Sequence, residues 1–357
     1  MIRKFLINSA LVISSLALTS LIAEAGYRLL TDTPLTQNKN FLSEQLELLE
    51  LKSTIISHDP LLGWKLAENF GKLGSDFVTG KYGVRMNDGN IASLKTGGVL
   101  AVGDSFTAGS GVKNHEAWPA QLETIIDTPV INASSGGWGT DQIILRAEQL
   151  APKVLPETII ISLLAQDSLR NSYDLYGVGY KPWFEIKNEE LVLNGVPVPQ
   201  LQDQPVWLGP LRSIFGYSWF VHSTMMKIAP FWWANVSLRY NRVLTNEQGI
   251  EVSCKLMERL AKMATDTGIR IVVVMQYGGQ ESIDETPPWY GKDVSKCTAI
   301  AGLEILDTHA PLHQVSKENY DKFVRLWIDE GGQLGHMSSA GNQFIAKLIA
   351  DRYFSSP

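Results

Sequence analysis

Two residues of the chain have the types and the settings of a nucleophile and its base. Ser105 lies in the run GDSFTAG at residues 103–109, directly after a short apolar segment. Among six histidines, His336 lies in the run GHMSSAG at residues 335–341, ahead of a helix-forming segment. A serine hydroxyl becomes a strong nucleophile when an imidazole takes its proton, so this pair could perform acyl transfer through a covalent intermediate.

The serine loop departs from the better-known motifs of its kind. Thr107 replaces the second glycine of Gly-x-Ser-x-Gly, and Ala108 replaces the lysine of Ser-x-x-Lys. A dinucleotide fingerprint would need glycine at position 105. Because Gly, Asp and Ser are also ordinary turn residues, the loop by itself does not establish a site.

Two further loops follow predicted strands and offer groups that stabilise an anion. The run NASSGGWGT occupies residues 132–140, and AQD occupies residues 165–167. Glycine allows close backbone approach to a bound group, and a side-chain amide offers N–H donors to an oxyanion. The candidate groups therefore follow one another along the chain in the order serine, glycine, side-chain amide, histidine.

Taken together, these four loops resemble those of the SGNH/GDSL hydrolases, in membrane-anchored or secreted bacterial members, over roughly residues 97–355. The resemblance implies that Ser105 is the nucleophile and His336 the base. It also implies an oxyanion hole made by the backbone N–H groups of Ser105 and Gly137 and by the amide of Gln166. Gln166 stands where the family usually has asparagine, so its donor would come from a longer arm.

A second departure from the family concerns the group that orients His336. The family usually has an aspartate two or three residues earlier, whereas those positions hold Leu334 and Gln333. Asp329 and Glu330 lie further upstream and could serve only if the two glycines after them let the chain fold back. The orienting group therefore stays open between Gln333, Asp329 and Glu330, and losing it can lower the rate by up to about four orders of magnitude.

These residues favour an extracytoplasmic serine esterase or O-acyltransferase that works through an acyl-enzyme. The resemblance implies acyl esters as substrates, acetyl esters among them, and a cell-envelope polysaccharide as their carrier. The alternative is a membrane-tethered binding or assembly protein with a degenerate site, which Gln166 and the missing aspartate favour. No cofactor or metal is expected: His309 and His313 have helical spacing, but no third ligand accompanies them and Pro311 interrupts a helix.

The elements that must position these loops alternate between apolar runs and helical segments. Short runs rich in Val and Ile, separated by helix-forming segments, predict a parallel sheet covered on both faces. We expect a three-layer α/β/α sandwich with about five parallel strands over residues 96–357, and the resemblance to the SGNH/GDSL hydrolases implies that its sheet is flavodoxin-like. The runs that predict strands are 98–102, 129–131, 158–164, 269–274 and 303–307.

Two regions interrupt this alternation. Residues 31–95 are polar and broken by Gly and Pro, which predicts a linker followed by an irregular N-terminal layer. An insertion is expected at about 172–245. It holds half of the ten tryptophans, which could form a rim for sugars or membrane or could simply be buried.

The first thirty residues have the features of a membrane anchor or a signal peptide. Arg3 and Lys4 precede an uncharged run over residues 5–23, and Ala25 offers a cleavage site. An uncleaved helix would hold the protein at the inner membrane facing the periplasm or the cell exterior, whereas cleavage after Ala25 would release it.

Composition limits the kinds of partner that the protein can bind and bears on the redox state of its two cysteines. The chain has 357 residues, with 31 Lys and Arg against 37 Asp and Glu, and a net charge of -6. It has no basic surplus to hold a phosphate backbone, so nucleic acid is not an expected partner. In an oxidising compartment Cys254 and Cys297 could form a disulfide.

Overall fold

The protein consists of two compact units, which are described separately. The smaller contains residues 1–53 and 202–238, and the larger contains residues 54–201 and 239–357. The expected insertion at 172–245 is therefore divided between the two. The computed structural model describes residues 2–36, 40–42, 54–90, 94–177, 179–200, 209–229, 232–233 and 239–355.

A five-stranded sheet forms the centre of the larger unit, and all its neighbouring strands are parallel. The strand order β12-β11-β5-β3-β4 is that of a flavodoxin-like fold, which confirms the predicted class. After β3 the chain forms β4 on one side of that strand, and it then crosses over to form β5 on the other side. Ligands bind such sheets where the strand order reverses, at the carboxyl ends. The strands are β3 (Val99–Gly103), β4 (Val130–Asn132), β5 (Thr158–Leu164), β11 (Arg270–Gln276) and β12 (Glu304–Asp307).

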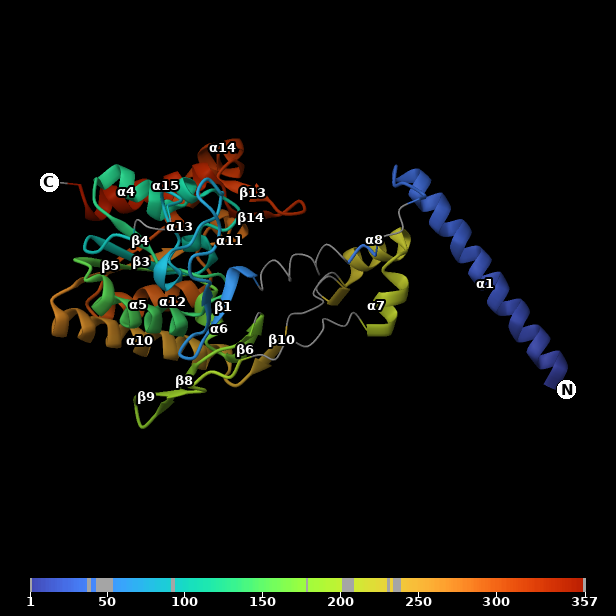
Figure 1. Cartoon of the computed structure of the whole chain (residues 1–357), viewed down its shortest axis with the longest axis horizontal. Coiled ribbons are helices and arrows are strands. Elements are labelled where there is room, and N and C mark those ends of the chain that lie inside the picture. Colours follow the sequence, from blue (N-terminus) through green and yellow to red (C-terminus); the bar gives the residue numbers. More distant parts are fainter. Residues whose placement is uncertain are drawn as a thin grey trace. The chain divides into compact units, whose positions relative to one another are not determined.

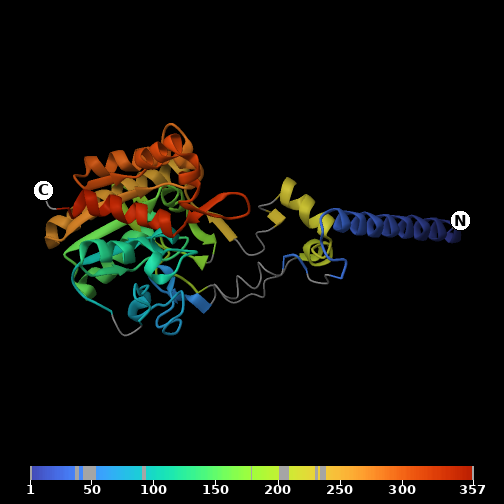
Figure 2. The same ribbon diagram turned by 90° about the horizontal axis from the view of Figure 1, so that it is seen from above.

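Helices cover both faces of this sheet, as Figures 1 and 2 show. Alternate residues of β3 explain why two layers form: Leu100 and Val102 belong to one buried cluster, whereas Val99 and Ala101 belong to the other. The first cluster includes side chains of α5 (Thr140–Val154), α10 (Asn246–Thr267) and α12 (Trp289–Ile300). The second includes side chains of α4 (Trp118–Ile126), α13 (His309–Glu318) and α15 (Ser339–Tyr353).

The part of the N-terminal layer from residue 54 onward belongs to the larger unit and packs on its core. Strands β1 (Ile56–Asp59) and β2 (Gly63–Leu66) pair as an antiparallel hairpin, and η1 (Lys81–Gly83) follows as a short 3-10 helix. Leu62, Trp64, Val78 and Met86 are buried in the cluster that contains α5. The layer thus contributes to the core as well as covering it.

Within the larger unit, a buried ion pair connects the part of the insertion that forms small antiparallel sheets to α5. Lys181 Nζ contacts Asp141 at the start of α5, and both side chains are fully buried. Burial raises the pKa of Asp141 despite the nearby lysine, and it lowers the pKa of Lys181 despite the nearby carboxylate. The strands are β6 (Tyr173–Gly177), β7 (Gly179–Tyr180), β8 (Trp183–Lys187), β9 (Glu190–Asn194) and β10 (Arg239–Arg242).

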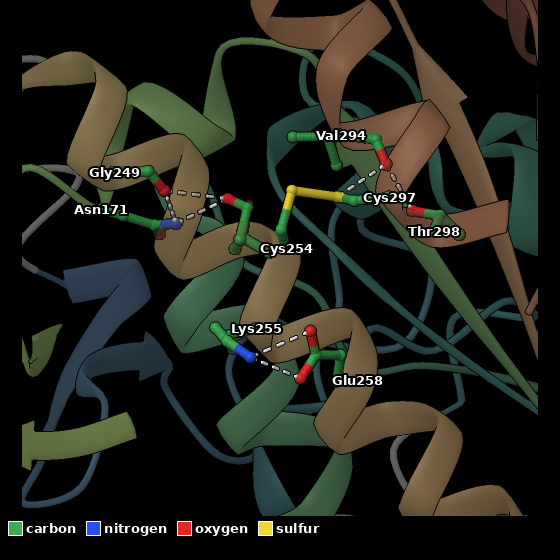
Figure 3. The surroundings of a disulfide bond; sticks show 10 residues. Asn171, Gly249, Cys254, Lys255, Glu258, Val294, Cys297 and Thr298 are labelled. Atoms are coloured by element: carbon green, nitrogen blue, oxygen red, sulfur yellow. Dashed lines mark hydrogen bonds and ion pairs between the residues drawn. A yellow bond between two sulfur atoms is a disulfide. The ribbon is translucent and has the colours of Figure 1, made fainter. Parts of the chain in front are cut away.

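A disulfide joins two helices on one face of the central sheet (Figure 3). Cys254 of α10 and Cys297 of α12 are bonded, with 5.4 Å between their Cα atoms and a sequence separation of 43. The bridge therefore links the helix that precedes β11 to the helix that precedes β12.

In the smaller unit, the end of the N-terminal helix caps a second helix. The helices are α1 (Ile2–Leu30), α7 (Gly209–Phe215) and α8 (Trp219–Ile228). The Glu24 carboxylate accepts hydrogen bonds from the backbone N–H groups of Trp219 and Phe220 and from the hydroxyl of Ser218. Burial alone would raise the pKa of Glu24, but these bonds and Arg28 outweigh it and lower the pKa to about 2.

Within the described residues, no helix combines the length and the apolar character needed to cross a membrane.

Candidate active site

The predicted nucleophile lies where β3 turns into a one-turn helix. Helix α3 (Ser105–Ala108) starts directly after the strand, and its cap residue Asp104 accepts a hydrogen bond from Phe106 N at 2.9 Å. A Cβ at Gly103 would lie 2.2 Å from the hydroxyl oxygen of Thr107, so this tight turn requires glycine. Ser105 is left partly exposed at the carboxyl edge of the sheet.

The predicted base reaches this serine from a hairpin near the C-terminus. Strands β13 (Trp327–Asp329) and β14 (Leu334–Met337) pair antiparallel, and both glycines of the connecting loop have a positive φ, 71° and 83°. His336 Nε2 lies 3.0 Å from Ser105 Oγ, although 231 residues separate them in the sequence. This is hydrogen-bond geometry for a nucleophile and its general base.

Of the three candidates for the orienting group, Glu330 contacts the imidazole. Its Oε1 lies 2.7 Å from His336 Nδ1 and also accepts the backbone N–H of His336 at 3.2 Å. Asp329 instead accepts a hydrogen bond from Gly332 N, and the carbonyl of Gln333 accepts one from Glu330 N. Burial pushes the pKa of Glu330 upward, but the bonds from His336 outweigh it and lower the pKa. A charged carboxylate therefore faces Nδ1, which leaves Nε2 to accept the serine proton.

The glycines of the second loop lie beside the nucleophile. A Cβ added to Gly136 would come within 3.6 Å of Ser105 Cβ, and Gly137 has a left-handed backbone with φ of 78°. Among the described residues, neither the N–H of Ser105 nor that of Gly137 donates to another group. Both donors are thus available to an oxyanion.

The predicted third donor is bonded to a carboxylate. Gln166 is exposed, and its Nε2 donates to Glu281 Oε1 at 3.1 Å. Glu281 belongs to α11 (Gly279–Ile283) and also accepts from the hydroxyl of Tyr290. A role for Gln166 in the oxyanion hole stays a prediction, because it would require its amide to turn or to use its second N–H.

One arginine that the sequence reasoning missed connects the first three loops. Nη1 of Arg170, at the end of α6 (Asp167–Arg170), donates to Asp104 at 3.2 Å, to the carbonyl of Trp138 at 2.8 Å and to Asp167 at 2.5 Å. Burial and the charge of Asp104 raise the pKa of Asp167 well above its usual range despite the arginine. The i, i+3 spacing of Asp167 and Arg170 was the only sequence signal for these contacts between the loops.

Two other supports were also missed. The indole of Trp64 donates to the carbonyl of Gly136, and the indole of Trp138 donates to the carbonyl of Trp64, each at 3.0 Å. The N-terminal layer therefore fixes the second loop. The buried side chain of Arg85 donates to the carbonyls of Ala108 and Gly109 and so holds the end of α3. No local sequence pattern marks Trp64 or Arg85.

The other candidate residues lie elsewhere. Trp219, Trp232 and Trp233 are in the smaller unit, Trp183 is in β8 of the larger one, and Trp207 lies outside the described residues.

The two histidines with helical spacing lie on one helix. His309 and His313 stack with ring centroids 5.7 Å apart. Pro311 lies in the first turn of α13, where a helix tolerates proline, so the expected interruption of the helix is wrong. In the described part of the chain, no three His, Cys, Asp or Glu side chains are grouped to hold a metal.

Comparison with known proteins finds likenesses among solved structures. No protein-family model matches the chain, and no curated protein sequence matches it. A lipolytic G-D-S-L family protein of Veillonella parvula is 11% identical with a TM-score of 0.38, covering 73% of this chain and 100% of that one. The acetyl xylan esterase AlAXEase is 11% identical with a TM-score of 0.41, covering 72% and 99%.

The psychrotrophic esterase EstA of Pseudoalteromonas is 13% identical with a TM-score of 0.38, covering 71% of this chain and 94% of that one. The four ordered loops carry the family resemblance more specifically than these values do. In its parallel sheet and in those loops, the larger unit is similar to the SGNH/GDSL hydrolases.

Proposed function

We propose that the protein is a serine esterase that uses Ser105, His336 and Glu330. The observation that supports this most strongly is the continuous contact from Glu330 through His336 to Ser105, at 2.7 Å and 3.0 Å. A degenerate site would have no requirement to keep three such side chains within hydrogen-bond distance of one another when they come from two separate loops. The geometry therefore favours an enzyme over a binding or assembly protein.

In the acylation step, Ser105 Oγ attacks the carbonyl carbon of an ester while His336 Nε2 takes the hydroxyl proton. Glu330 holds Nδ1–H and stabilises the imidazolium that forms. The backbone N–H groups of Ser105 and Gly137 face the negative charge that develops on the carbonyl oxygen. His336 then returns the proton to the leaving alcohol as the C–O bond breaks, and an acyl-serine remains.

In the deacylation step, a hydroxyl compound attacks the acyl-serine. His336 takes its proton and returns it to Ser105 Oγ as the acyl group leaves. Water gives hydrolysis, and a sugar hydroxyl gives transfer by the same proton movements. Arg170 does not touch the reacting atoms; it positions the loops that carry them.

A fluorophosphonate probe tests this function directly. Its phosphorus forms a bond to an activated serine oxygen and fluoride leaves, so labelling reports the nucleophile without a known substrate. We expect labelling of the wild-type protein and hydrolysis of p-nitrophenyl acetate, and neither in Ser105→Ala. An unlabelled wild-type protein, or equal labelling of Ser105→Ala, would refute the proposal.

We further propose that the larger unit works outside the cytoplasm. The Cys254–Cys297 disulfide supports this, because disulfides persist mainly in oxidising compartments. Attachment through the N-terminal helix, or release by cleavage after Ala25, remains part of the proposal. Mass analysis of the mature N-terminus, together with fractionation of cells, would distinguish these outcomes, and an intact chain in the cytosolic fraction would contradict both.

A further inference from the structure

The start of α8 is packed into the smaller unit. Glu24 accepts three hydrogen bonds there, and the ring centroid of Trp219 lies 4.9 Å from that of Phe41 and 5.5 Å from that of His222. The indole of Trp233 donates to His222 Nδ1 at 3.0 Å, and Trp233 is only 2% exposed. The end of α1, the start of α8 and these rings therefore form one packed group.

Apolar side chains on the other side of α7 and α8 remain exposed. Leu211, Ile214 and Phe215 have the i, i+3, i+4 spacing that places side chains on one face of α7. Phe220 and Ile228, at i and i+8, share a face of α8, and no described side chain of that helix is buried. Single exposed apolar side chains are ordinary, but a set gathered on two consecutive helices indicates an interaction surface. This surface, the α7–α8 face, consists of Leu211, Ile214, Phe215, Tyr217, Phe220, Met226, Ile228 and Trp232, which are 39% to 71% exposed.

The charges around this face are all positive. Residues 204–238 contain no Asp or Glu, whereas Arg212 and Lys227 lie in α7 and α8. The guanidinium of Arg212 lies over the ring of Trp232, 4.6 Å from its centroid, and Lys227 precedes Ile228 on the exposed side of α8. Apolar and aromatic side chains accompanied by basic but no acidic ones are typical of helices that lie in a membrane interface.

The position of α1 favours a bilayer over a protein as the partner of this face. Glu24 is the first charged residue after the uncharged run 5–23, and it holds the first residues of α8, so α8 begins where that run ends. The run also exposes apolar side chains, and a bilayer covers both sets because it has no fixed shape that they must match. The exposed side chains described in the run include Ile7, Leu11, Leu18, Leu21 and Ile22, at 50% to 67% exposure.

We infer that the α7–α8 face lies on the surface of a lipid bilayer, with its apolar side chains at the boundary between headgroups and acyl chains. Arg212 and Lys227 would then extend their charged ends to the headgroups. The inference deepens the proposed attachment to a membrane and rests on it for the nearby bilayer. It requires neither a span by α1 nor the esterase reaction.

The full chain allows a direct test, because its two cysteines are bonded to each other and an introduced cysteine supplies the one free thiol. Ile228→Cys reports on α8 and Ile22→Cys reports on α1, while Leu73→Cys, at a position 80% exposed in the larger unit, is the matched control. Each variant is labelled with the environment-sensitive dye NBD. It is then reconstituted into vesicles of phosphatidylethanolamine and phosphatidylglycerol in a three-to-one ratio. Lipids with a nitroxide near the headgroup or near the chain end quench a dye that lies at the same depth.

The dye at position 228 should emit at shorter wavelength and be quenched by the shallow nitroxide at least about threefold more strongly than the dye at position 73, because an interfacial helix is buried about 5–10 Å into the boundary. Quenching at position 22 alone would leave attachment through α1 standing and overturn the inference. Quenching at position 228 alone would support the inference and remove α1 from the attachment. Blue-shifted but unquenched emission at position 228 would show that a second copy or another protein segment covers the face, and emission equal to that at position 73 would show that nothing covers it. Either result would overturn the inference.

Discussion

Replacing Glu330 with glutamine should slow the esterase reaction about 100-fold while leaving the fold in place. The change removes the charge that faces His336 Nδ1 at 2.7 Å but keeps the size of the side chain. Two unit charges about 4 Å apart interact by about 1 kcal/mol in water and about 4 kcal/mol at an effective dielectric constant of about 20. The side chains of His336 and Glu330 are 30% and 49% exposed, so the interaction energy between the carboxylate and the imidazolium should lie between these limits. That range corresponds to a loss of roughly 5-fold to 1000-fold in rate.

The loss should appear in kcat for p-nitrophenyl acetate and in the rate of fluorophosphonate labelling. KM should change little, because the imidazolium exists only after the proton has moved. Gln333→Ala is the matched control, since Gln333 lies in the same hairpin and contacts Glu330 through its backbone carbonyl. A fall of less than threefold in Glu330→Gln, or an equal fall in both variants, would refute the role assigned to Glu330.

Three further outcomes are expected. Lys181→Met should lower the free energy of unfolding by about 3–5 kcal/mol in urea titrations, because Asp141 would remain buried without its partner; an unchanged midpoint would contradict this. Replacing Cys254 and Cys297 together by serine should cost roughly 4 kcal/mol in the loop-entropy model for a separation of 43 residues, and a reducing agent should then have no further effect. Because the folded pKa of Glu330 is lowered from 4.5, its stabilising contribution should be fully present above pH 4.5 and disappear as the pH falls through the folded pKa. The stability difference between wild type and Glu330→Gln should therefore shrink with acidification, and a difference that grows would show the sign to be wrong.

The local pattern of residues was sufficient to predict the five strands of the central sheet and their order along the chain. Runs such as 158–164 are mostly apolar and are buried at every position, because a parallel strand is covered on both faces. Gly268 ends α10 in a left-handed conformation, as its position after a long helical segment predicts. These features depend on neighbours in sequence, which is why they could be found without a structure.

The insertion was harder to place. Its hairpin around Asn188 and Glu189 follows from local turn chemistry, and both residues have a positive φ. However, the division of residues 172–245 between two units depends on which distant surfaces they cover. Composition alone carries no information on that choice.

The sequence by itself determined the candidates: a serine in a turn after a strand, a histidine before the last helix and three possible partners for it. Only the tertiary structure decided that Ser105 and His336 meet, because their contact spans 231 residues and depends on the packing of the sheet. The structure also selected Glu330, since the antiparallel hairpin with its two left-handed glycines turns that carboxylate back onto His336. Asp329, one residue earlier, faces the turn instead. Contacts of this kind depend on backbone direction at single residues, which side-chain type and spacing do not specify.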